Sequence, residues 1–160
     1  MIKNLDKANI PMANLLQIKE EQGLRFYKDC IHKTNQFSTK YILQKFLREH
    51  QDHIEKLKNE LQDTAEKSLA KQFLKQLAKS DPPQELCKEY DLSTLTLVEA
   101  TKLAIRLAEN DIDFYGHLLE QKLKIVSRQA LEKIISEKAS FVKQLKSEYN
   151  KILYGSKMKI

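Results

Sequence analysis

Apolar residues recur at intervals of three and four along four long segments of the chain. The second segment shows this most clearly, with Leu43, Phe46, Leu47, Ile54, Leu57 and Leu61. Such spacing places the apolar side chains on one face of an α-helix and leaves polar residues on the other. The first helix is expected to begin near Pro11, because proline is favoured in an opening turn. The pattern predicts four helices, each about 35 Å long at 1.5 Å per residue, over roughly 11–33, 39–62, 97–122 and 128–153.

Residues that favour helix ends flank these segments. Ser38 and Ser127 are candidate N-caps of the second and fourth helices. Thr96, with Glu99 three residues later, forms a capping-box signature before the third helix. Gly155 is expected to end the fourth helix, because glycine commonly follows the last helical residue.

The segment between the second and third helices, residues 63–96, is long enough to form a crossover. Asp63 and Glu66 resemble a capping box for a shorter helix, and the SDPP sequence at 80–83 ends it because proline disfavours helix in the residue before it. Four long helices with one long, partly helical crossover predict an all-α fold, the ferritin-like variant of the four-helix bundle. We expect one domain over residues 1–160, with helical repeats at roughly 12–62 and 97–153.

Composition and charge narrow the possibilities further. The chain has only three glycines and three prolines, and it contains no apolar run long enough to cross a bilayer and no signal-type apolar block at its start. Cys30 and Cys87 are isolated, so no CxxC metal site can form. We therefore expect a cytoplasmic protein without a membrane partner. The net charge is +6, but basic residues alternate with acidic ones along the chain, which argues against a nucleic-acid partner.

The two halves of the chain repeat each other. KEEQGLRFY at 19–27 aligns with LAENDIDFY at 107–115 with an offset of 88 residues, and both contain a Phe-Tyr pair. FLREHQDHIEKL aligns with IISEKASFVKQL with an offset of 87, which places His50 on Glu137 and His53 on Ser140. Two helical hairpins that face each other across a pseudo-twofold axis would explain this repeat.

The Phe-Tyr segments, the helix lengths and the crossover resemble the rubrerythrin branch of the ferritin-like superfamily, over roughly residues 12–150. Members of that branch carry a Glu seven residues before the Tyr, and acidic residues with a His one helix later. The resemblance implies a di-iron centre that reduces peroxide, often with a rubredoxin-like domain as electron donor, and a homodimer. No such electron-transfer domain can be recognised in this chain.

Only part of the family's ligand set is present. Carried over one position at a time, the resemblance assigns ligand-capable side chains to Glu20, His50, His53 and Glu137. The other two positions hold Ala108 and Ser140; we leave open whether Glu49, Glu109 or Asp111 replaces a lost ligand. Because both ions would lose ligands, di-iron peroxidase or ferroxidase activity is disfavoured.

Two interpretations of the remaining polar residues follow. In the first, two carboxylates and two imidazoles hold one Fe, Zn or Mn ion with a role in iron or oxidative-stress handling. In the second, His50 donates to Glu20 or Glu137 in a buried polar network that Tyr27 and Tyr115 complete. The chain would then be a metal-free helical scaffold or oligomerisation module without catalysis.

Overall fold

The fold was analysed in a computed structural model, which describes residues 12–60, 71, 75–77, 85 and 88–158. Within these residues the secondary structure is helical, without strands, and this confirms the all-α prediction. The elements are α1 (Met12–Lys33), α2 (Phe37–Glu60), the 3-10 helix η2 (Leu92–Thr94), α5 (Leu97–Leu119) and α6 (Ile125–Met158). Most of the predicted crossover, including the cap at Asp63 and the residue Cys87, lies outside the described residues.

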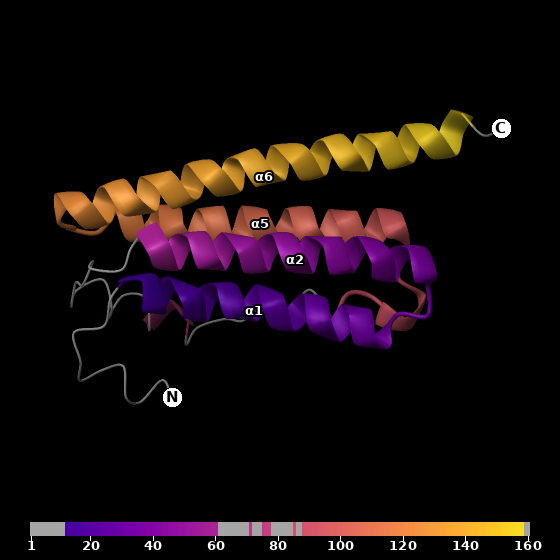
Figure 1. Ribbon diagram of the computed structural model, residues 1–160, viewed down its shortest axis with the longest axis horizontal. Helices are drawn as coiled ribbons and strands as arrows, with labels where there is room; N and C mark the ends of the chain where they lie inside the picture. The colour runs from indigo at the N-terminus through magenta and orange to yellow at the C-terminus, as the bar shows by residue number, and fades with distance from the viewer. Residues whose placement is uncertain (1–11, 61–70, 72–74, 78–84, 86–87, 159–160) are drawn as a thin grey trace.

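The long helices form two consecutive pairs that lie side by side (Figure 1). α1 packs along α2, α5 packs along α6, and α2 also contacts α5. α6 has 34 residues against 23 in α5, and its C-terminal end runs past the other helices (Figure 1). None of the described helices is both long and apolar enough to cross a lipid bilayer.

The end of the crossover is fixed against the turn between α1 and α2. The backbone N–H of Asn35 donates to the carbonyl of Ser93 at 3.0 Å, and the Thr39 hydroxyl donates to the carbonyl of Leu95 at 2.7 Å. These bonds satisfy polar groups that would otherwise be buried without partners. The returning chain therefore enters α5 beside the start of α2.

The predicted capping box at the start of α5 is confirmed. The Thr96 hydroxyl accepts from the Glu99 backbone N–H, and the Glu99 carboxylate accepts from the Thr96 N–H. The two together satisfy donors that the first turn of a helix cannot pair internally.

Three other predicted helix ends are wrong. α2 begins before Ser38, because the N–H of Lys40 already bonds to the carbonyl of Gln36 at 2.9 Å. α6 begins before Ser127, which is buried inside its first turn. Gly155 lies within α6, and no glycine among the described residues has the positive φ of a C-terminal cap.

The core consists of two apolar clusters with a polar layer between them. One cluster includes Phe26, Phe46, Leu103 and Val142, and the other includes Leu16, Tyr115, Leu131 and Ile134. Along α1, α5 and α6, the residues between the two clusters are buried and polar: Lys19, Glu20, Asp111 and Lys138. Charged groups are rarely buried between helices unless they pair, so this layer is the candidate functional site.

Candidate functional site

Glu20 is the centre of the polar layer, and its side chain is fully buried. The ammonium of Lys138 lies 2.8 Å from one carboxylate oxygen and 2.9 Å from the other. Nε2 of His50 lies 2.9 Å from Oε2, and the Tyr115 hydroxyl donates to Oε1 at 2.8 Å. α1, α2, α5 and α6 thus each contribute one side chain to a single carboxylate site.

Lys138 also pairs with a second buried carboxylate. Its Nζ donates to Oδ2 of Asp111 at 3.1 Å, while Nζ of Lys19 lies 3.4 Å from the other oxygen of Asp111. Lys19 donates further to the Gln22 amide oxygen at 3.3 Å. Two carboxylates and two ammonium groups therefore balance their charges inside the bundle, which is the condition under which buried charges are tolerated.

The electrostatics of the layer keep these groups ionised. Burial alone would raise the pKa of Glu20, but the charge of Lys138 and the hydrogen bond from His50 hold that pKa well below its usual value. Burial would lower the pKa of Lys138, but Asp111 and Glu20 raise it above that of an ordinary lysine. Burial and the Glu20 charge raise the pKa of Tyr115, so its hydroxyl stays protonated and remains a donor.

His50 can approach Glu20 closely because α1 has a glycine, Gly23, where the imidazole packs against it. Its Nε2 lies 2.9 Å from the backbone carbonyl of Glu20 as well as from its carboxylate. Both partners are acceptors, so Nε2 must be the nitrogen that carries the proton. A Cβ atom on Gly23 would lie 3.0 Å from this nitrogen. The glycine therefore leaves the space that the imidazole occupies.

His53 and Glu137, the other two predicted ligands, lie near each other. His53 Nδ1 is 3.8 Å from Oε2 of Glu137, which is too long for a hydrogen bond. His53 Nε2 and Glu137 Oε2 are both buried atoms without a hydrogen-bond partner. Burial and the nearby Lys138 lower the pKa of His53 to about 4, so its ring is neutral at pH 7.

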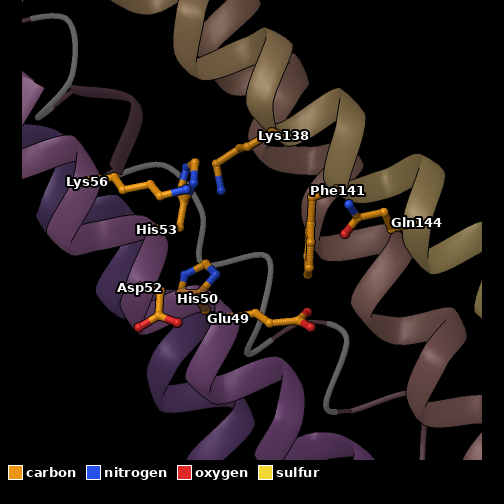
Figure 2. Close-up of a pocket in the computed structure, with 8 residues that line it drawn as sticks. All are labelled: Glu49, His50, Asp52, His53, Lys56, Lys138, Phe141 and Gln144. Carbon is orange, nitrogen blue, oxygen red and sulfur yellow. The ribbon is translucent and has the colours of Figure 1, made fainter.

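An open pocket of about 270 Å³ between α2 and α6 leads to this layer. Figure 2 shows Lys138 pointing into it from α6, with His50 and His53 facing it from α2. Glu49, Asp52, Lys56, Phe141 and Gln144 complete the lining. Burial raises the pKa of Glu49, which lies at this opening and 4.0 Å from Lys45.

A small cavity of about 20 Å³ lies behind the pocket, beside Tyr27 and Ala108. In the repeat, Ala108 is the counterpart of Glu20, and Tyr27 is the counterpart of Tyr115. Tyr115 has a carboxylate to bond, whereas Tyr27 faces the space that the alanine leaves open. A cavity of this size, also lined by His50, Asp111 and Lys138, suits one water molecule.

The residues of this layer do not fit a metal centre. Among the described residues, no group of three or more His, Cys, Asp or Glu side chains is placed to hold a metal ion. The Lys138 ammonium lies between Glu20 and Asp111, where a cation would have to bind. Ala108 supplies no ligand, and Ser140 is exposed on the surface. Of the possible replacement ligands, Glu109 is exposed, and Asp111 forms ion pairs with Lys19 and Lys138.

Lys138 is the residue that sequence reasoning missed. An offset of 87 paired His50 with Glu137, but the offset of 88 that holds for the Phe-Tyr segments pairs His50 with Lys138. The structure follows the second register: His50 and Lys138 both contact Glu20, while the Glu137 side chain is 31% exposed. A lysine on the apolar stripe of Leu131, Ile134, Val142 and Leu145 was the available signal.

In comparisons with family models, with curated proteins and with solved structures, nothing matched this chain.

Proposed function

We propose that this protein is a ferritin-like four-helix bundle of the rubrerythrin type that works without a metal ion. In this proposal the buried ammonium of Lys138 takes the place of the cation, and the chain serves as a helical scaffold that binds a partner instead of catalysing redox chemistry. The single observation that carries the proposal is the pairing of Lys138 with both Glu20 and Asp111. The homodimer expected from the resemblance stays a prediction.

Charge balance supports this function over residual metal binding. A divalent ion at Glu20 would have to displace an ammonium that is almost completely buried and paired with two carboxylates. The displaced ammonium would repel the ion or lose its partners, and an uncompensated buried charge costs several kcal/mol, on the order of 3–5. Because its raised pKa keeps Lys138 protonated, it is also unsuited to act as a nucleophilic amine.

The experiment measures metal content and stability together. Untagged protein, purified without chelator and then loaded anaerobically with Fe²⁺, Zn²⁺ or Mn²⁺, is analysed by ICP-MS and thermal unfolding. The wild type should hold no stoichiometric metal. Lys138→Ala should gain metal binding, seen as a metal-dependent rise in Tm, because Glu20, Asp111 and His50 then lack a cation.

Two further variants separate the role of charge from that of packing. Lys138→Met should lower the free energy of unfolding by about 3–5 kcal/mol, as expected when one partner of a buried pair is removed. Lys143→Met, at an exposed position on the same helix, should change it little. The proposal would be overturned if the wild type held about one metal ion per chain and substitutions in the site removed that ion. The substitutions to compare are Glu20→Ala with His50→Ala, and His53→Ala with Glu137→Ala. An unchanged free energy of unfolding in Lys138→Met would overturn the proposal as well.

A further inference from the structure

A second hollow lies between α2 and α6, beyond the pocket over the polar layer. It is a groove of about 640 Å³ between the start of α2, the start of α5 and the C-terminal part of α6. Its lining is mostly apolar, and the apolar residues are Phe37, Tyr41, Ile42, Leu97 and Ile152. We refer to it as the α2–α6 groove. The ion pair of Lys45 with Glu148 joins the two helices along its edge.

Two aromatic side chains of the groove are exposed to solvent. Phe37 is 85% exposed and Tyr41 is 64% exposed. They lie four residues apart on α2 and therefore share one face of the helix. Adjacent exposed aromatic side chains around an apolar hollow are typical of a surface that another molecule covers.

Two segments of the helices that line the groove have a surplus of basic residues. Residues 33–48 contain four basic residues and no acidic one: Lys33, Lys40, Lys45 and Arg48. Residues 143–154 contain three lysines and one acidic residue, Glu148. The surplus of these two segments equals the net charge of +6 of the whole chain, so the remaining residues are balanced. Most of the first segment lies in the first half of α2, and the second lies in the C-terminal half of α6; both helices contribute residues to the lining of the groove.

We infer that the α2–α6 groove binds an acidic amphipathic helix of a partner protein. The walls formed by α2 and α6 and the mostly apolar floor fit the apolar face of such a helix, and Lys45 and Lys151 in the lining fit acidic residues on its flanks. The inference rests on the proposed scaffold function and names the chemistry of its partner. A second copy of this chain is a poor occupant, because a symmetric dimer would bring two basic surfaces together.

Other anionic ligands fit the groove less well. Ile42 and Leu97 are only partly exposed between helices, so a flat bilayer surface would not reach them. A nucleic-acid strand would place polar base edges against a floor whose lining is mostly apolar. An apolar helix face flanked by carboxylates matches both the floor and the charge.

The test uses the full-length protein and a fluorescein-labelled, hydrocarbon-stapled peptide. The peptide carries leucine at every third and fourth position and glutamate on the flanks, and a second peptide carries lysine in place of glutamate. In fluorescence anisotropy, the acidic peptide should bind saturably and one to one, while the lysine peptide should not bind. Tyr41→Ala and Lys151→Glu should each weaken binding about tenfold or more, as expected for an aromatic anchor and a complementary charge.

Matched controls lie elsewhere on the surface. Val126→Ala removes an apolar side chain of similar exposure at the other end of α6, and Lys102→Glu reverses an exposed charge on α5. Both should leave binding unchanged. Absence of saturable binding, or equal losses in the controls, would overturn the inference. So would preferential binding of an oligo-dT strand or of phosphatidylserine vesicles that depends on Tyr41 and Lys151. Because neither residue touches Lys138 or Glu20, such a failure would leave the metal and stability results at Lys138 unaffected.

Discussion

The space that Gly23 leaves for His50 gives a direct test of the polar layer. In Gly23→Ala the new methyl carbon would lie 3.0 Å from Nε2 and 3.2 Å from Cε1 of His50. These distances are shorter than ordinary van der Waals contact, so the imidazole or α1 must move. The imidazole cannot move freely, because Nε2 is held at 2.9 Å by the carboxylate and the carbonyl of Glu20.

The expected size of the effect comes from two opposing contributions. Alanine stabilises a helix interior by about 0.8–1.0 kcal/mol relative to glycine. Overpacking a fixed site costs about 1–3 kcal/mol. Gly116→Ala is the matched control, because a Cβ atom there meets nothing within 4 Å and only the favourable contribution remains. We therefore expect Gly23→Ala to be less stable than Gly116→Ala by about 1–3 kcal/mol.

Urea unfolding followed by far-UV circular dichroism measures this difference, with each variant compared with the wild type at pH 7. The same Gly23→Ala change made in a His50→Ala background removes the clash, and there it should stabilise the protein by as much as Gly116→Ala does. If Gly23→Ala stabilises the wild type as strongly as Gly116→Ala, His50 does not occupy the place described, and the account of the layer is wrong.

Two further predictions concern hydrogen bonding and pH. Tyr115→Phe removes a hydrogen-bond donor to the buried Glu20 carboxylate and should lower the free energy of unfolding in urea by about 1.5–3 kcal/mol. The control Tyr154→Phe, at an exposed position, should leave that free energy unchanged. Equal effects of the two variants would contradict the hydrogen bond between Tyr115 and Glu20. His53 has its pKa lowered from 6.5 to about 4 in the folded protein, so between these values the unfolded chain binds more protons and stability falls as the pH falls. The loss should reach up to about 3 kcal/mol below pH 4. His53→Gln should remove that part of the pH dependence and the exposed His32→Gln should not; an unchanged profile in His53→Gln would refute the assignment.

The fold was largely predictable because local rules agree with the overall arrangement. The three-and-four spacing predicted the four long helices, and the capping box at Thr96 and Glu99 marked the start of α5 correctly. The two serine caps were wrong because the backbone carbonyls of Gln36 and Lys124 already accept the first helical hydrogen bonds of α2 and α6. Ser127 lies on the buried face of α6, where tertiary packing outweighs the preference of serine for the N-cap position.

The candidate site was predictable in part. The structure brings Glu20 and His50 together, and the alternative of a polar network with Tyr115 as a donor agrees with its hydrogen bonds, while the predicted role of these residues as metal ligands stays a prediction. Asp111 was unusual on an apolar face, and the structure shows that it pairs with Lys138. Lys138 was missed because the second pair of segments was aligned with an offset of 87 instead of 88, and one residue turns a helix by about 100°.

The balance of charge in the polar layer matters more for metal binding here than the number of possible ligands. A dinuclear site in a ferritin-like di-iron protein gathers four carboxylates around two metal ions, so the charge of that site is strongly negative before metal binds. In this chain the layer holds two carboxylates, Glu20 and Asp111, and two ammonium groups, Lys19 and Lys138, so it is already neutral. A cation would have to compete with a neutral, hydrogen-bonded network, and a network that is fully paired gains nothing from an additional positive charge. In the proposed metal-free function, the buried ammonium of Lys138 supplies the positive charge that Glu20 and Asp111 need, so this one residue replaces the metal ion in the layer.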